Sequence, residues 1–260
     1  MLKRVSVFLY GVLCYVVFFA TFLYAVGFVC NLYVPRSMDG PPTASLATGL
    51  AIDLVLLLLF AAQHSVMARP AFKAWWTRII PDPAERSTYV LASSVALLIL
   101  FAFWEPLGGV IWSVTDPTAA IVLYSLCAFG WLLVLVATFL LNHFDLFGLR
   151  QVWLYLTGQP YTHLTFRTPG PYRLVRHPLY VGWLFAFWAT PNMTLTHLVF
   201  ALATSGYILV AIQLEERDLV RHLGSEYSNY RKRVPMLIPG ASLLRKRSPD
   251  AAPHRSPTGS

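Results

Sequence analysis

The sequence predicts an all-α fold: a polytopic membrane helix bundle of about five to six membrane helices, with a C-terminal helical hairpin. Composition is the first reason, because 57% of the 260 residues are hydrophobic and only 12% are charged, whereas a soluble domain carries about 25% charged residues. The second reason is a series of apolar runs long enough to cross about 30 Å of hydrocarbon. The third is the distribution of the basic residues, which divides the loops into two classes.

Four N-terminal spans are expected before the hairpin. The first follows Lys3 and Arg4, lacks charged residues, and is too long for the apolar part of a signal peptide, so we expect it to be retained. Asp116 and Pro117 are a suitable start for the fourth, as an acidic cap followed by proline at the first helical position. The four expected spans cover residues 5–30, about 46–67, about 87–104 and about 117–141.

The C-terminal hairpin follows a 37-residue polar stretch, 142–178. Its two arms, 179–190 and 197–214, are each short for a membrane span, and the Pro191-Asn192 pair marks the turn between them. Beyond the hairpin, the sequence predicts a polar amphipathic extension over 215–239. A tail rich in proline and serine, 248–260, is expected to be disordered.

Lys and Arg residues indicate the orientation. If both termini lie on one side of the membrane, all of the 20 basic residues except Arg36 fall on that side. The positive-inside rule then makes this side cytoplasmic. The sequence therefore predicts an integral protein of the bacterial cytoplasmic membrane with both termini cytoplasmic. The same asymmetry explains the net charge of +8 without a nucleic-acid partner.

Ionisable residues in an apolar span need a reason, because each is costly unless it is paired or hydrated. Asp53 and His64 lie about three turns apart in the second span and therefore share a face. Asp53 is open to two interpretations, a structural partner for a neighbouring helix or a functional group. His64 lies near the cytoplasmic end, so it is the stronger functional candidate. The three cysteines all lie in apolar runs without a CxxC pair, and no metal site is predicted.

Two polar clusters flank the hairpin. The first is RTPGPYRLVRHPLYVG, 167–182, in which a helix is expected to begin near Pro178, with its positive end beside Arg176 and His177. These charges have a simpler alternative explanation as anchors at the lipid headgroups. The second cluster, Glu215 to Asp218, closes the second arm, where surface salt bridges are the alternative. A hairpin brings its two ends together, so the two clusters are expected to be neighbours.

These segments resemble the isoprenylcysteine carboxyl methyltransferase family. The resemblance rests on GPYRLVRHPLYVG (170–182) and EERDLVRHLGSEYSNYRKRVPMLIP (215–239). Members are integral-membrane methyltransferases that bind S-adenosylmethionine in their C-terminal half. QHSVMARP (63–70) and NHFDLFGLRQ (142–151) are more similar to a bacterial branch related to the denitrification-linked NnrU proteins. The sequence lacks the glycine-rich loop of soluble Rossmann methyltransferases.

The resemblance implies a cytoplasmic pocket for S-adenosyl-L-methionine and a single membrane domain over 1–247. Residues 1–141 would supply four helices, and 142–240 the cofactor-binding and catalytic part. The positions that match family motifs and are expected to bind the cofactor are Tyr172, Arg176, His177, Tyr180, Glu215, Glu216, Tyr227 and Tyr230.

The expected reaction is S-adenosylmethionine-dependent methyl transfer to a small thiol, with methanethiol giving dimethyl sulfide. A small alkanethiol is mostly protonated at neutral pH, so a general base is needed. The candidates are His143 and Asp145, followed by His64, with Asp145 orienting or activating the base. The alternatives are another thiol or a lipid as acceptor, or a non-enzymatic haem or redox membrane protein in which histidines serve as axial ligands.

Overall fold

The computed structural model describes residues 1–162 and 164–240, and the expected tail 248–260 lies outside these residues. Five of its helices are long and apolar enough to cross a membrane, and a sixth apolar helix is shorter. The prediction of an all-α bundle of five to six membrane helices is therefore confirmed. The six helices are α1 (Leu2–Cys30), α2 (Leu46–Met67), α4 (Glu85–Phe103), α5 (Pro117–Leu140), α8 (Pro178–Trp188) and α9 (Leu195–Leu223).

Shorter elements occupy the connections between these helices. The polar stretch 142–178 is not a plain loop, because α6, α7 and η2 lie within it. The amphipathic extension is also built differently from the expectation, since α9 continues through the second polar cluster before the chain bends at Gly224. The short elements are α3 (Pro70–Trp76), η1 (Asp82–Ala84), β1 (Val110–Ser113), α6 (His143–Leu146), α7 (Leu149–Thr157), η2 (Gly170–Arg173), β2 (Asn192–Thr194) and α10 (Ser225–Arg233).

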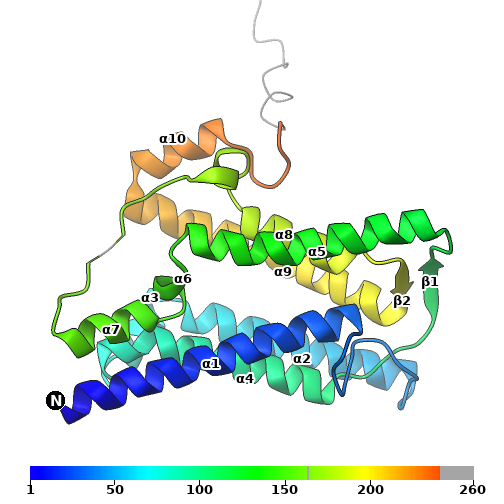
Figure 1. The fold of residues 1–260 in the computed structure, drawn as a ribbon, viewed down its shortest axis with the longest axis horizontal. Helices are drawn as coiled ribbons and strands as arrows, with labels where there is room; N and C mark the ends of the chain where they lie inside the picture. Colours follow the sequence, from blue (N-terminus) through cyan, green and yellow to red (C-terminus); the bar gives the residue numbers. More distant parts are fainter. Residues whose placement is uncertain (163, 241–260) are drawn as a thin grey trace, which may run out of the picture.

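The apolar helices form two layers. α1, α2 and α4 make one layer, and α5, α8 and α9 make the other (Figure 1). Within the first layer α4 packs against both α1 and α2, and in the second layer α5 packs along α8. α2 also contacts α9, which joins the layers. Elements from the two halves of the sequence therefore face each other across the middle of the molecule.

The bundle has two chemically different ends. The N-terminus, α3, α7 and α10 lie at one end, which we call the basic end (Figure 1). β1 and β2 lie at the opposite end, which we call the strand end. There the two strands pair antiparallel, with Val110 opposite Thr194 and Ser113 opposite Asn192. This pairing, which the sequence did not predict, ties the turn of the α8–α9 hairpin to the α4–α5 connection.

The apolar core lies toward the strand end. It combines the last turns of α1, α4 and α8 with the first turns of α9 and the middle of α2 and α5. Trp104, at the C-terminal end of α4, is only 2% exposed, and its ring packs against Phe28 and Phe200.

α5 and α8 approach closely because glycines face each other. A Cβ atom added at Gly130 would lie 2.5 Å from the backbone nitrogen of Ala186. One added at Gly182 would lie 2.8 Å from the carbonyl oxygen of Gly130. Small residues at such a crossing let membrane helices pack backbone to backbone. Gly182, the glycine of the RHPLYVG segment, therefore fixes α8 against α5.

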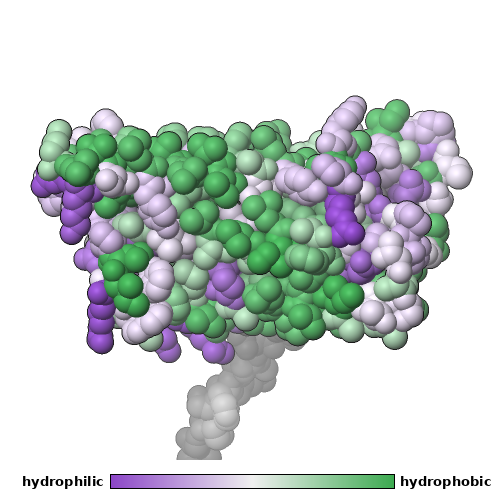
Figure 2. Space-filling view, turned by 90° about the horizontal axis from the view of Figure 1, so that it is seen from below, coloured by the Kyte–Doolittle hydropathy of each residue, from purple (hydrophilic) through white to green (hydrophobic). Residues whose placement is uncertain are grey.

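The outer surface of the helices is apolar. Figure 2 shows a hydrophobic surface across the middle of the molecule, with hydrophilic side chains gathered toward the two ends. Large aliphatic residues on α1, α2 and α5 are exposed, among them Leu13, Leu58 and Leu132. Lipid is the medium that suits such a surface. The protein is an integral membrane protein.

Candidate active site

The RHP loop and the C-terminal segment are joined through their backbones. η2 ends at Arg173, and α8 begins at Pro178, where the absence of an N–H costs no helical hydrogen bond. Between them, the N–H groups of Arg176 and His177 donate to the carbonyls of Pro235 and Met236, at 2.8 and 3.2 Å. Two segments about 60 residues apart are thereby held side by side.

Glu216 is the centre of a buried ion-pair network. Its Oε1 accepts from Arg176 Nε at 2.6 Å and lies 3.0 Å from His177 Nε2. Its Oε2 lies 3.1 Å from Arg231 Nε on α10. The Glu216 side chain is only 3% exposed, so protein groups occupy both carboxylate oxygens. The structure thus brings Arg176, His177 and Glu216 together, as expected for the two ends of a hairpin.

Glu215 has different surroundings, because consecutive helical residues point about 100° apart. Its side chain is 46% exposed, although it lies beside the same cluster. Oε2 accepts from the Tyr180 hydroxyl at 3.2 Å, and His177 Nδ1 lies 3.9 Å away. This carboxylate therefore keeps capacity for a cationic or hydrogen-bonding ligand.

Three tyrosines with motif matches support the network from the α10 side. Tyr172, Tyr227 and Tyr230 are all buried, and the Tyr230 hydroxyl donates to the backbone carbonyl of Tyr172 at 2.6 Å. Phe166 packs against the rings of Tyr227 and Tyr230. Burial raises the pKa of Tyr230 to about 12, so its hydroxyl stays protonated and remains a donor.

His64 lies in a hydroxyl-rich cluster between α2 and α4. Its Nδ1 is 3.1 Å from Ser93 Oγ, and the Tyr89 hydroxyl lies 3.0 Å from Nδ1 and 2.9 Å from Nε2. Ser93 donates its own proton to the Tyr89 carbonyl, so it accepts from Nδ1–H. A proton on Nδ1, accepted by Ser93, is the neutral tautomer that leaves Nε2 basic.

The His64 cluster and Glu215 face the same region of the molecule. On α9, the Tyr207 hydroxyl lies 3.1 Å from Ser65 Oγ, which follows His64 in α2. The hydroxyls of Tyr89 and Tyr207 are also close enough to Tyr180 for electrostatic interaction, and Tyr180 donates to Glu215. Tyrosines from α4, α8 and α9 therefore lie within electrostatic range of one another.

His143 and Asp145 lie in other surroundings. His143 is buried, with Nδ1 2.8 Å from Thr138 Oγ1 and Nε2 2.8 Å from the Tyr15 hydroxyl. Its ring stacks on Phe139 with centroids 4.2 Å apart, and burial lowers the pKa of the imidazole. Both ring nitrogens are thus occupied by hydroxyl groups.

Asp145 forms a separate ion pair. Its Oδ1 accepts from Arg150 at 2.8 Å, and its Oδ2 accepts from the Tyr161 hydroxyl at 3.3 Å. No hydrogen bond or ion pair joins it to His64 or to His143 among the residues that the structure describes. Asp53 is fully buried, and its Oδ1 accepts from the backbone N–H of Glu105, which caps the connection after α4.

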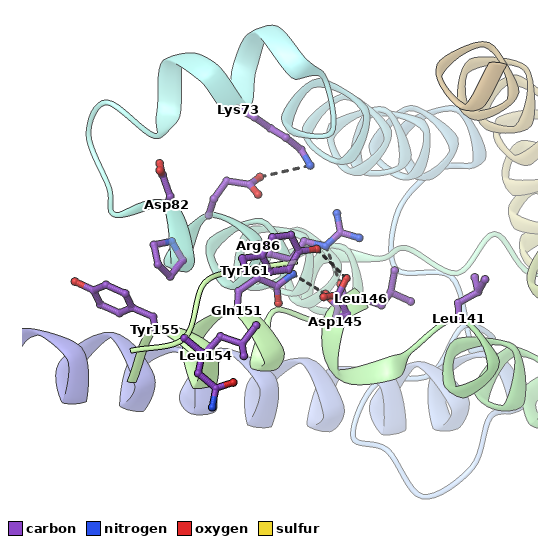
Figure 3. A pocket seen from close by; sticks show the side chains of 13 residues that line it. Lys73, Asp82, Arg86, Leu141, Asp145, Leu146, Gln151, Leu154, Tyr155 and Tyr161 are labelled. Carbon is purple, nitrogen blue, oxygen red and sulfur yellow. Dashed lines mark hydrogen bonds and ion pairs between the residues drawn. The ribbon is translucent and has the colours of Figure 1, made fainter. Parts of the chain in front are cut away.

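A cavity of about 600 Å³ opens at the basic end, between α3, η1, the start of α4 and α6–α7 (Figure 3). Asp145 lies on its wall, and Arg86 and Tyr161 extend into it. Arg86 also stacks over the Tyr89 ring, with its guanidinium carbon 5.3 Å from the ring centroid. The cavity wall is thereby linked to the His64 cluster. The charged and polar lining residues are Lys73, Asp82, Glu85, Arg86, Asp145, Gln151, Gln159 and Tyr161.

Sequence reasoning did not single out Tyr89, Ser93, Tyr207 or Arg86. One signal for three of them was present, because Arg86, Tyr89 and Ser93 are spaced i, i+3 and i+7 and form a polar stripe on one face of α4. Tyr207 gave no comparable signal, since a lone tyrosine in an apolar helix is common at membrane interfaces.

Comparison with known proteins shows relatives over almost the whole chain. The chain is 60% identical to the methanethiol S-methyltransferase of Crocosphaera subtropica over 238 residues, which cover 92% of this chain and 93% of that protein. It is 51% identical to the methanethiol S-methyltransferase of Mycobacterium tuberculosis, over 92% of this chain and 98% of that protein. A more distant relative is nurim of Rattus norvegicus, 35% identical over 70% of this chain and 72% of that protein.

No family model and no solved structure matches the chain. The identity to the relatives and the share of each chain that is covered are nonetheless high enough to show the family. They also replace the haem or redox alternative, because the two bacterial relatives are named as methyltransferases. The chain belongs to the methanethiol S-methyltransferase family of integral-membrane methyltransferases.

Proposed function

We propose that this chain transfers the methyl group of S-adenosyl-L-methionine to methanethiol and releases dimethyl sulfide. Its relatives carry this activity in their names over nearly the full length. One arrangement in the structure supports it most directly: Tyr180 donates to the exposed carboxylate of Glu215, and Tyr89, whose hydroxyl contacts His64, lies within electrostatic range of Tyr180.

The residues at this site fit S-adenosylmethionine, which would supply a methyl group on a positively charged sulfur. Glu215 offers a carboxylate with free capacity, and Tyr180 offers an aromatic face beside it, both suited to a cation. Arg176, His177 and Glu216 are largely occupied with one another, so in this proposal they hold the wall of the site rigid. Tyr172, Tyr227 and Tyr230 support that wall from behind.

The chemistry requires an ionised thiol. Bound S-adenosylmethionine would supply an electrophilic methyl group and would keep the electron pair of the broken carbon–sulfur bond on its own sulfur, so this chain has to present the acceptor as a thiolate. His64 Nε2 takes the thiol proton, and Ser93 fixes the tautomer that makes this nitrogen basic. The aromatic rings of Phe60 and Tyr89, which pack on the imidazole, exclude water from the reacting sulfur.

Of the three expected catalytic residues, His64 is the base in this proposal. Both histidines have hydroxyl groups at their two ring nitrogens, and His64 is preferred because Tyr89, its partner, lies within electrostatic range of Tyr180 beside Glu215. His143 contacts Tyr15 and Thr138 instead, so in this proposal it positions the junction between α5 and α6. Asp145 holds Arg150 and Tyr161 at the rim of the cavity. His64→Gln is therefore expected to lower kcat by about 100-fold or more, whereas His143→Gln retains turnover.

Headspace analysis tests the proposal directly. Purified protein in lipid nanodiscs, supplied with methanethiol and S-adenosylmethionine, is expected to release dimethyl sulfide and to form one equivalent of S-adenosylhomocysteine. Glu215→Gln removes the free carboxylate and should raise the KM for S-adenosylmethionine, while Glu226→Gln, at an exposed position on α10, serves as the matched control. If no dimethyl sulfide forms but a larger thiol or a lipid amine is methylated, the proposal is wrong about methanethiol, and that other compound is the acceptor.

In this proposal the basic end and both termini face the cytoplasm, where S-adenosylmethionine is made. The support is the positive-inside rule, since Arg36 alone among the described basic residues belongs to the strand end. Reporter fusions test it. A fluorescent protein at the C-terminus should be bright, and alkaline phosphatase inserted after Arg36 should be active; the opposite pattern would invert the topology.

A further inference from the structure

Arg86 carries a positive charge that the ion pairs of the cavity do not neutralise. Lys73 pairs with Glu85 at 3.8 Å, and Asp145 pairs with Arg150 at 2.8 Å. Arg86 itself donates from Nε to the Leu146 carbonyl at 2.8 Å. Among the described residues it forms no ion pair with Asp82, Glu85 or Asp145, the acids that line the cavity.

The guanidinium is held in one place. The Leu146 carbonyl fixes Nε, and the Tyr89 ring lies against the planar group, so the two terminal nitrogens extend into the open space of the cavity (Figure 3). Arg86 is only partly exposed, which limits the screening of its charge by water.

This charge lies next to His64, the base in the proposed function. Tyr89 connects the two groups, because the Arg86 guanidinium stacks on its ring and its hydroxyl lies 2.9 Å from His64 Nε2. Arg86 also interacts electrostatically with His64 itself. The other titratable groups that line the cavity with Arg86 are Lys73, Asp82, Glu85, Asp145, Tyr155 and Tyr161. Lys73 pairs with Glu85, and Asp145 pairs with Arg150.

A fixed, uncompensated cation beside a base stabilises an anion that forms there. Thiols next to arginine ionise at lower pH than free thiols. We infer that Arg86 is the anion-stabilising positioning residue of the acceptor site, which favours the thiolate form of the bound thiol and holds Tyr89 against His64. The inference rests on the proposed function, because it assigns the thiol to this side of the site.

The pH profile of turnover tests the inference. Rates for wild type, Arg86→Gln and Arg86→Lys are measured from about pH 6 to about pH 9.5, a range that brackets the ionisation of a thiol. Arg86→Gln should lower kcat/KM for methanethiol at neutral pH about tenfold or more, since a nearby opposite charge moves a pKa by at least about one unit. The rising limb should move to higher pH, with rates that approach wild type there, and Arg86→Lys should restore part of the loss.

A more acidic acceptor separates thiol activation from a structural role. Methaneselenol has nearly the same shape as methanethiol and is already ionised at neutral pH, so the deficit of Arg86→Gln should largely disappear with it. Arg78→Gln, which changes an exposed arginine just before η1, should leave both acceptors unaffected. An equal loss for thiol and selenol at every pH, or an unchanged profile, would overturn the inference.

Binding without cofactor provides a readout that does not depend on turnover. Methanethiol bound to wild type should show the ultraviolet difference absorption of a thiolate at a pH below the pKa of the free thiol, and Arg86→Gln should weaken that band. If wild type shows the band but forms no dimethyl sulfide, the proposed function fails while this inference stands. If wild type turns over without any such band, the inference fails alone.

Discussion

Glu215 and Glu216 are neighbours in the sequence, but the fold gives them different roles. Glu216 is buried among two arginines and a histidine, whereas Glu215 is half exposed and bound only by Tyr180 and, at longer range, His177. Glu216→Gln should therefore destabilise the protein by about 3 kcal/mol or more, because it leaves buried Arg176 without its counter-charge. Glu215→Gln should fold normally and lose affinity for S-adenosylmethionine.

Thermal unfolding in detergent, followed alongside cofactor binding, separates these two effects. A melting temperature for Glu216→Gln equal to that of wild type would show that the ion-pair network contributes little to stability. A Glu215→Gln variant that melts early would show that this carboxylate also has a structural role.

His143 makes stability depend on pH. Its burial lowers the pKa of the folded imidazole below the ordinary value of about 6.5. Below that pH the unfolded chain takes up a proton that the folded protein resists, so stability is full above about pH 6.5 and declines as the pH falls. The melting temperature of His143→Gln should fall less steeply than that of wild type between neutral and mildly acidic pH. His222→Gln, at an exposed position, should keep the wild-type slope, and identical slopes for all three proteins would contradict the assignment.

At the scale of elements, the crossing of α5 and α8 depends on Gly130 and Gly182. Alanine at either position would place a methyl group against backbone atoms of the partner helix, which cannot move aside as a side chain can. Each change should cost about 1–3 kcal/mol, which exceeds the gain of about 1 kcal/mol in helix propensity. Gly206→Ala in α9 is the control, because nothing lies within 4 Å of its added Cβ. Melting temperatures of the three variants in nanodiscs decide the question, and equal values would show that α8 can shift away from α5.

The helices themselves were largely predictable. Long uncharged runs predict membrane helices with few alternatives, because an unpaired backbone in lipid is too costly. The boundary at Pro178 and the cap at Asp116 were also readable from sequence, and both are present in the structure. The strands β1 and β2 were missed, because a three- or four-residue strand depends on a partner far away in the sequence.

At the scale of the whole molecule, the two layers also meet through a pair of cysteines. Cys30 ends α1, Cys127 lies within α5, and their sulfur atoms are 3.7 Å apart. Mild oxidation with copper–phenanthroline should link them without large movement. After denaturation, polyethylene-glycol maleimide should then label only Cys14 in the oxidised protein, but all 3 cysteines in the reduced protein.

Cys30→Ser provides the matched control, since it should leave both remaining thiols open to labelling after oxidation. Full labelling of oxidised wild type would mean that α1 and α5 do not meet as described. If the cross-link does form, the activity of the oxidised protein shows whether the two layers must separate near these cysteines during turnover.

The sequence by itself determined the number of membrane helices, their approximate limits, the asymmetry of charge and the proximity of His177 and Glu216. It could do so because hydrocarbon excludes charge and a hairpin brings its ends together. Only the tertiary structure decided that Glu216 is enclosed while Glu215 is open, and that His143 contacts Tyr15 while His64 contacts Tyr89. It also decided that Arg86 lies beside Tyr89 without an ion pair to another described residue. These differences depend on which side chains from distant helices meet, and the pattern along a single chain does not carry that information.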